Sequence, residues 1–128
     1  MMVYIYLFIA GGFGVIARFA SVRWVNAFFA AGFPYGTLFV NVLGSLLFGF
    51  LSWYLVNRES HFISTDELKV AVLTGLLGGY TTFSAFSMEM LQFLQNGQLL
   101  KALLYMLLSV MICVCACFAG VVLAKQIV

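Results

Sequence analysis

The sequence predicts an all-α integral membrane protein that crosses the bilayer four times. Hydrophobic residues make up 65% of the 128 residues and charged residues only 8%, and the mean hydropathy is +1.13. A soluble domain of this length could not cover its surface with so few charged side chains. A spanning helix needs about 20 apolar residues. Four apolar windows of that length nearly fill the chain, so we expect residues 1–128 to form a single transmembrane domain.

The first window runs from about residue 3 to residue 28 and contains Arg18. The fifteen uncharged residues before Arg18 are too few, at about 1.5 Å per residue, to cross a hydrocarbon core of roughly 30 Å. We therefore expect Arg18 near a membrane face or beside a wet cavity. No basic segment opens the window, which favours an uncleaved span over a signal peptide.

The second window, about residues 37–56, follows the chain's only proline, Pro34. Pro34 stands between Gly32 and Gly36 in a sequence typical of a turn, and we predict that this turn ends the first helix. A polar loop over residues 57–69 holds most of the acidic residues of the chain. We expect this loop to be solvated.

Two further windows, about residues 69–95 and 99–125, complete the pattern. Four helices joined by short connections place both termini on one side of the membrane. The basic residues then divide equally, with Arg58, Lys69 and Lys125 on the side of the termini and Arg18, Arg23 and Lys101 on the other. An equal count gives no orientation by the positive-inside rule. Either the count is uninformative in so small a protein, or the chain inserts both ways and pairs as an antiparallel, dual-topology homodimer.

Each window also contains two small residues spaced four apart. Small residues let helix backbones approach closely in lipid. The pairs are Ala10 with Gly14, Ser45 with Gly49, Gly75 with Gly79, and Ala116 with Gly120. We predict that every helix packs against another.

The third window is predicted to be a broken helix. Gly78 and Gly79 lose backbone entropy in a helix, and the hydroxyls of Thr81 and Thr82 compete for backbone hydrogen bonds. Unwound backbone at this depth is tolerated only where protein buries it or an ion satisfies it. Freed carbonyls suit a hard cation, and freed N–H groups suit an anion. The alternative is an intact helix that packs its glycine-rich face against a neighbour.

Several polar residues lie within the predicted spans, where they cost free energy unless a neighbour satisfies them. Asn41 can join two helices by hydrogen bonds or offer an amide donor to a dehydrated anion. Tyr105 and Ser109 are spaced four apart, so both hydroxyls share one helix face. These hydroxyls can join helices or extend the same set of neutral donors.

Two parallel stripes follow the predicted break. Phe83 and Phe86 are three apart and share one face, and Ser84 and Ser87 share an adjacent face. An aromatic ring has a positive edge, so phenylalanine edges can line an anion path without a fixed charge that traps the ion. Ordinary packing or lipid contact is the alternative for any such pair.

The sequence offers little for other chemistry. His61 is the only histidine and lies in the polar loop, so a hydrolase site has no base within the spans. Cys113, Cys115 and Cys117 match no zinc spacing, and we predict that they pack as buried side chains. Glu89 is the only acidic residue within a span. It supports a competing hypothesis, a small proton-coupled multidrug-type exporter.

Three segments, residues 11–19, 35–44 and 75–89, resemble those of the Fluc (CrcB) family of fluoride channels. The pattern Gly-Gly-x-Thr-Thr-Phe-Ser-x-Phe-Ser, with Gly-Thr-Leu-x-x-Asn upstream, is specific, and the resemblance runs the length of the chain. It implies a channel, not an enzyme, that exports fluoride passively across a bacterial inner membrane. It also implies an antiparallel homodimer with two pores and a structural sodium ion (Na+) at its centre, and no nucleic-acid partner.

The resemblance also assigns roles to individual residues. The backbone carbonyls of Gly78 and Thr81 would hold sodium, and Arg18 would lie in the vestibule. The fluoride pore would be lined by Asn41, Phe83, Phe86, Ser84, Ser87, Tyr105, Ser109 and Glu89. The family commonly has a threonine where this chain has Ala85. Any role of that hydroxyl is then absent or taken by Ser84 and Ser87.

Overall fold

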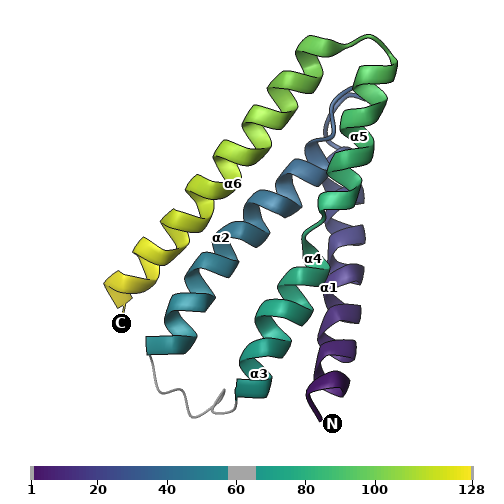
Figure 1. The fold of residues 1–128 in the computed structure, drawn as a ribbon. Coiled ribbons are helices and arrows are strands. Elements are labelled where there is room, and N and C mark those ends of the chain that lie inside the picture. Colours follow the sequence, from purple (N-terminus) through teal and green to yellow (C-terminus); the bar gives the residue numbers. More distant parts are fainter. Residues whose placement is uncertain (1, 58–65, 128) are drawn as a thin grey trace.

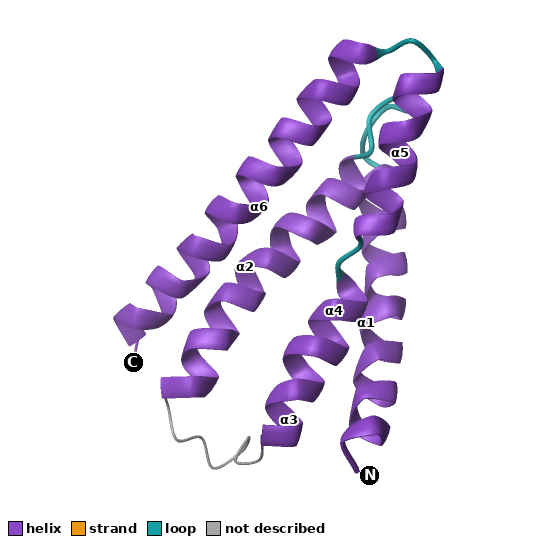
Figure 2. Ribbon diagram, viewed as in Figure 1, coloured by secondary structure: helices purple, strands orange, loops and turns teal. Residues whose placement is uncertain are grey.

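The computed structural model describes residues 2–57 and 66–127, and in this part of the chain the only regular elements are helices (Figures 1 and 2). The elements are α1 (Met2–Asn26), α2 (Tyr35–Asn57), α3 (Asp66–Val70), the π-helix η1 (Ala71–Leu77), α4 (Gly78–Tyr80), α5 (Phe83–Gln95) and α6 (Leu99–Ile127). Taken as one span, α3 to α5 is the third of four stretches that are long and apolar enough to cross a membrane. The predicted all-helical, four-span fold is confirmed, and the chain is a multi-pass membrane protein.

The connections divide between the two ends of the bundle. Figure 1 places both ends of the chain at the same end of the bundle as the start of α3. The α1–α2 connection and the turn between α5 and α6 lie at the opposite end. Arg58, Glu59 and His61 of the predicted polar loop lie outside the described residues.

The prediction that the Pro34 turn ends the first helix is wrong. Helix α1 already ends at Asn26, and its last turn tightens through a hydrogen bond from the Phe28 amide to the Val25 carbonyl. The Asn26 side-chain oxygen accepts the Gly36 amide at 3.0 Å, so it satisfies a donor in the first turn of α2. Pro34 directly precedes α2, where its missing N–H costs no helical hydrogen bond.

Close backbone contacts at glycine join the helices in two pairs. Gly14 lies against the Leu76 carbonyl, which packs α1 on η1, and Gly79 lies against the Gly11 carbonyl. On the other side of the bundle, Gly49 of α2 meets the Cys117 backbone, and Gly120 of α6 meets the backbone of α2 at Leu46 and Phe50. The small-residue pairs therefore mark helix contacts, as predicted.

These contacts make Gly120→Ala destabilising even though alanine favours helix. A Cβ at Gly120 would overlap the α2 backbone, and overpacking of this kind costs about 1–3 kcal/mol. Gly12→Ala is the matched control, because no atom outside the helix backbone lies within 4 Å of a Cβ there. It is expected to be neutral, or stabilising by up to about 1 kcal/mol. Thermal unfolding in detergent measures both, and equal midpoints for the two variants would contradict the packing.

Candidate functional site

The third span departs from helix at Thr81 and Thr82, which are both extended (φ −87°, ψ 159° and φ −149°, ψ 117°). Asn41 of α2 faces this point with both ends of its amide. Its Oδ1 accepts the Thr82 amide at 2.8 Å, and its Nδ2 donates to the Thr82 carbonyl at 3.0 Å. The Asn41 amide therefore takes the place of a peptide group. It pairs with the N–H and C=O of Thr82, which lie outside the helices. Of the two roles predicted for Asn41, joining helices is the one that these contacts perform.

Thr82 also begins the helix that follows. Its Oγ1 accepts the Ala85 amide at 3.2 Å, which caps the N-terminus of α5. The Ser84 hydroxyl lies 3.3 Å from the same oxygen. Asn41 and Thr82 together satisfy backbone groups that would otherwise be unsatisfied at membrane depth.

The carbonyls of Gly78 and Thr81 lie beside this interruption. In a continuous α-helix the Gly78 carbonyl would accept the Thr82 amide, but that amide donates to Asn41 instead. The Thr81 carbonyl lies 3.4 Å from Nη1 of Arg18, which donates to it. Arg18 stands eight residues before the end of α1, about 12 Å along the helix axis. Its guanidinium therefore contacts the interrupted third span.

Glu89 accepts two short hydrogen bonds from neighbouring helices. The Thr37 hydroxyl donates to Oε1 and the Tyr105 hydroxyl donates to Oε2, each at 2.6 Å. The carboxyl group therefore joins α5 to α2 and α6. In this arrangement the hydroxyl protons of Thr37 and Tyr105 point at Glu89, so an anion must compete with a carboxylate for them.

The Tyr105 ring is fully buried at the centre of an aromatic cluster. Its centroid lies 5.1 Å from that of Phe86, 5.3 Å from that of Phe33 and 6.1 Å from that of Phe93. The cluster surrounds the Tyr105 side chain with apolar groups, and its hydroxyl reaches Glu89. Tyr105 is thus held by aromatic packing around its ring and by the hydrogen bond of its hydroxyl to Glu89.

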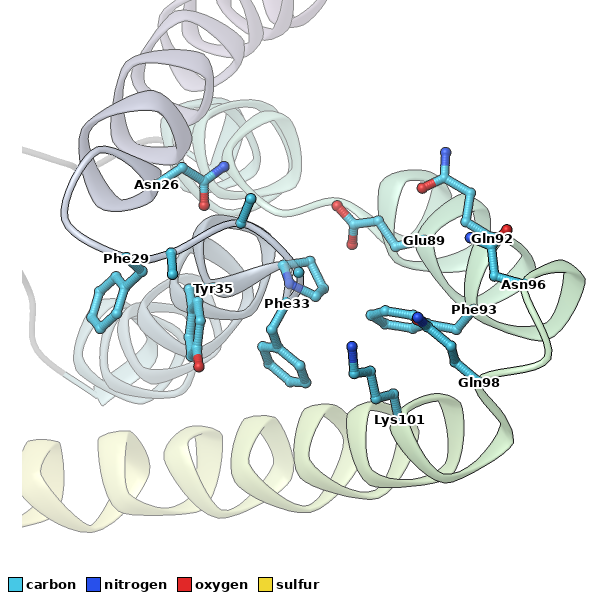
Figure 3. A pocket seen from close by; sticks show the side chains of 14 residues that line it. Asn26, Phe29, Phe33, Tyr35, Glu89, Gln92, Phe93, Asn96, Gln98 and Lys101 are labelled. Carbon is cyan, nitrogen blue, oxygen red and sulfur yellow. The ribbon is translucent and has the colours of Figure 1, made fainter.

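Two cavities lie on either side of this cluster. The first, of about 590 Å³, opens at the end of the bundle that carries the α1–α2 connection. Figure 3 shows Glu89, Lys101 and the amide side chains of Asn26, Gln92, Asn96 and Gln98 around it, with the Lys101 ammonium and the Glu89 carboxyl group facing the same space. The lining of this cavity therefore combines neutral amides with one basic and one acidic side chain.

The second cavity, of about 380 Å³, lies beside the interruption of the third span. Its lining brings together six of the predicted site residues, Asn41, Gly78, Thr81, Phe83, Phe86 and Ser109. Ser109 is only 7% exposed, and its hydroxyl has no hydrogen-bond partner within residues 2–57 and 66–127. A buried hydroxyl normally has a hydrogen-bond partner, so Ser109 is unusual in this respect.

The two predicted phenylalanines differ in their surroundings. Their rings are neighbours, with centroids 5.4 Å apart, as the predicted common face requires. Phe83 is nevertheless 78% exposed, whereas Phe86 is 9% exposed and packs on Tyr105. The pair therefore runs from the surface of the subunit into its interior.

Four predicted site residues line neither of the two cavities formed by the described residues: Tyr105, which is buried in the aromatic cluster, and Arg18, Ser84 and Ser87. Arg18 instead contacts the Thr81 carbonyl. Ser84 and Ser87 lie on the exposed face of α5, and the Ser87 hydroxyl donates to the Phe83 carbonyl of its own helix at 2.9 Å.

The sequence reasoning missed Thr37 and misjudged the cysteines. Thr37 stands four residues before Asn41 in α2, and this spacing could have placed the two polar groups on one face. The prediction of buried packing for the cysteines is wrong, because Cys115 is exposed and the thiols of Cys113 and Cys117 are half-buried and free.

Known proteins are similar to this chain over most of its length. The model of the family described as "CrcB-like protein, Camphor Resistance (CrcB)" matches residues 5–121. A protein of Methylococcus capsulatus named "Fluoride-specific ion channel FluC" is 45% identical over 119 residues, which is 93% of this chain but 51% of that relative, so the chain spans about half its length.

Two shorter relatives are covered almost throughout. Proteins with the same name from Acidithiobacillus ferrooxidans and Hahella chejuensis are 48% identical over 107 residues and 40% identical over 123 residues. These alignments cover 84% and 96% of this chain and 83% and 94% of the relatives. With four membrane-spanning helices and a family match from residue 5 to residue 121, the chain belongs to the CrcB family.

Proposed function

We propose that this protein is a fluoride-selective ion channel that lowers intracellular fluoride by passive, electrogenic export across a bacterial inner membrane. The observation that carries the proposal is the second cavity, whose lining brings Asn41, Phe86 and Ser109 together beside the interruption of the third span. The names of the relatives point to the same ion. A channel of this kind moves an ion down its gradient and catalyses no reaction.

The lining of the cavity suits a small, strongly hydrated anion. A pore must replace the water around the ion with donors that hold it weakly enough to let it leave. Asn41, Ser109 and the ring edges of the phenylalanines are neutral, so none of them traps fluoride as a fixed positive charge would. The nearest polar cluster, Glu89 with Thr37 and Tyr105, continues the polar surface toward the first cavity.

The exposed side of the site supports a homodimer. Phe83 and Gly78 of the cavity lining are exposed in the single subunit, and an exposed apolar surface at the mouth of a cavity suits a partner. An antiparallel second copy would present the same surface and would create two equivalent pores. The equal division of basic residues supports the dual topology that such an antiparallel pair requires.

A structural sodium ion at the centre of the dimer fits the carbonyls of this chain in part. Hard cations take oxygen ligands, and the Gly78 carbonyl lacks its helical partner because the Thr82 amide bonds to Asn41. The Thr81 carbonyl already accepts the Arg18 guanidinium, so sodium at this oxygen would share it with a second cation. Two copies would contribute four such carbonyls, and Arg18 would set how readily Thr81 takes part.

Ion efflux from liposomes that contain the purified protein tests the function. Fluoride efflux is expected under a fluoride gradient alone, with chloride efflux near that of protein-free liposomes. A drug driven by a pH gradient is expected not to accumulate. Chloride efflux as fast as fluoride efflux would contradict selectivity.

Glu89 distinguishes the channel from a proton-coupled exporter, the second candidate. An exporter that uses Glu89 as its proton site should lose all activity in Glu89→Gln, and a pH gradient should drive uphill transport in the unchanged protein. For the channel we expect the membrane potential to follow the fluoride gradient. Glu89→Gln is expected to lower flux without abolishing it, because an amide still accepts from Thr37 or Tyr105 through its oxygen. Measurements in voltage-clamped vesicles give the direction of transport and the flux of Glu89→Gln. Uphill transport would exclude the channel.

Labelling from the two sides of the membrane tests dual topology. Asp66 suits a cysteine probe, because its side chain is 98% exposed and its only described ion pair, with Lys69 at 3.6 Å, is on the surface and contributes little. We expect Asp66→Cys, with the three natural cysteines replaced by serine, to react with an impermeant thiol reagent from both sides of sealed vesicles. The antiparallel dimer would be ruled out by labelling from one side only.

A further inference from the structure

Lys101 is the only basic residue among the described residues that line the first cavity. Figure 3 shows its ammonium group directed into the space that the Glu89 carboxyl group also faces. The only ion pair among the described residues joins Lys69 to Asp66, so Lys101 forms none there. Its positive charge is therefore free to act on an ion in the cavity.

Glu89 is the only acidic residue among the same lining residues. Its two carboxyl oxygens accept hydrogen bonds from Thr37 and Tyr105, each at 2.6 Å. These hydrogen bonds connect Glu89 to the interior of the bundle, but a carboxylate still repels an anion that enters the cavity. Lys101 supplies the opposite charge, which offsets this repulsion.

The stability of helix α6 does not account for a lysine at this position. Lys101 lies in the first turn of α6, and this turn has no acidic residue. The N-terminus of a helix carries a partial positive charge, so a cation in the first turn is unfavourable for the helix. The position of Lys101 thus favours a role in the cavity.

The size and the neutral groups of the cavity suit an ion that keeps its water. Its volume is about 590 Å³, whereas a water molecule in the liquid occupies about 30 Å³. The side-chain amides of Asn26, Gln92, Asn96 and Gln98 line it as well. Amide N–H groups donate hydrogen bonds to an anion or to its water without adding a fixed charge.

We propose that the first cavity is the entrance of the ion path and that Lys101 concentrates fluoride there by long-range electrostatic attraction. This inference rests on the proposed function. A charged cleft raises the local concentration of an oppositely charged ion and its rate of entry, by about tenfold or more. A hydrated anion in a wide cavity is attracted by its charge and not by its size. Lys101 therefore promotes entry, and fluoride is distinguished from chloride further along the path.

Lys101→Gln tests the proposal, because it removes the charge and keeps a polar side chain. Fluoride efflux is measured from liposomes of neutral lipid, with fluoride well below saturation. At an ionic strength of about 0.01 M, where charges act over about 30 Å, we expect efflux to fall about tenfold. At about 1 M, where they act over about 3 Å, the difference from the unchanged protein should disappear. Lys101→Arg should conduct normally, and the ratio of fluoride to chloride efflux should not change in either variant.

Arg23→Gln is the matched control. Arg23 is an exposed basic residue in the last turn of α1, at the same end of the bundle, and it lines neither cavity. Its guanidinium lies 5.6 Å from the centroid of the Phe19 ring. We expect Arg23→Gln to conduct normally at both ionic strengths. Equal losses in Arg23→Gln and Lys101→Gln would assign the attraction to the whole surface, and a loss in Lys101→Gln that persists at high ionic strength would make Lys101 structural. Either result would overturn the inference.

Chemical modification can place either charge at position 101. Lys101→Cys, with the three natural cysteines replaced by serine, is treated in detergent with 2-aminoethyl or 2-sulfonatoethyl methanethiosulfonate. Each reagent forms a disulfide with the thiol and releases methanesulfinate. At low ionic strength we expect the positive adduct to raise fluoride efflux above that of the untreated variant and the negative adduct to lower it.

The remaining outcomes separate this inference from the proposed function. Equal effects of the two adducts, or no effect of either, would overturn the role of charge at Lys101. If the unchanged protein passes no fluoride, the proposed function itself fails. Normal fluoride efflux in Lys101→Gln at both ionic strengths removes only the role of Lys101.

Discussion

Replacing Phe86 with isoleucine is expected to lower fluoride efflux by roughly ten- to a hundredfold, because each 1.4 kcal/mol of lost stabilisation along the path slows passage tenfold. The change removes a positive ring edge at the wall of the second cavity. Isoleucine is also large and apolar, so repacking costs commonly less than about 1.5 kcal/mol. Size-exclusion elution should therefore stay that of the unchanged protein, and liposome efflux measures the loss.

Phe83→Ile and Phe8→Ile complete this experiment. Phe83 borders the same cavity but is 78% exposed, and Phe8 of α1 is 83% exposed and remote from both cavities. We expect Phe83→Ile to impair efflux strongly and Phe8→Ile to leave it unchanged. Near-normal flux in both cavity variants would show that the aromatic rings only pack, even though the chain belongs to the CrcB family. Phe48 is unsuitable as a control because it lines the same cavity.

Asn41→Ala is expected to destabilise the protein and to abolish flux. The substitution removes both hydrogen bonds to the Thr82 backbone. Each buried polar group left without a partner costs about 1–3 kcal/mol, so the loss is roughly 2–6 kcal/mol, and lipid offers no water to replace it. Thermal unfolding in detergent and liposome efflux should both show the change.

Asn57→Ala is the matched control for this variant. Asn57 is also in α2, and its Nδ2 donates to the Trp53 carbonyl at 2.9 Å, but the bond is exposed and local. We expect this control to shift the unfolding midpoint little and to conduct normally. If Asn41→Ala is as stable as the control, the Asn41 amide does not support the interruption of the third span.

The sequence was sufficient for the four helices because each needs only a long apolar window, and hydropathy measures that property directly. It was insufficient for the connection that follows α1. The Asn26 side chain at the end of α1 accepts the Gly36 amide of α2, ten residues away, and no local pattern encodes this contact. The turn signal at Pro34 was genuine, but it marks the start of α2.

The site was predictable where a single residue is unusual for its surroundings. Asn41 and Ser109 are polar residues in apolar windows, and both reach the second cavity. Spacing was less informative about exposure. Phe83 and Phe86 share a helix face, but Phe86 is buried in the bundle and Phe83 is exposed at its surface. The packing of α5 on α6 determines which side chains of α5 are buried. Ser84 and Ser87 are exposed for the same reason.

The π-helix η1 sets how the residues that directly follow it in the third span are rotated about the helix axis. A π-helical turn holds more residues than an α-helical turn, so residues after Leu77 are rotated relative to those before Ala71. Each residue of an α-helix accounts for about 100° of rotation. Deleting one residue within Ala71–Leu77 should therefore rotate Gly78, which lies before the interruption at Thr81 and Thr82, relative to α3. The wide turn therefore fixes how Gly78 is rotated relative to α3, whereas the extended Thr81 and Thr82 set the direction of α5.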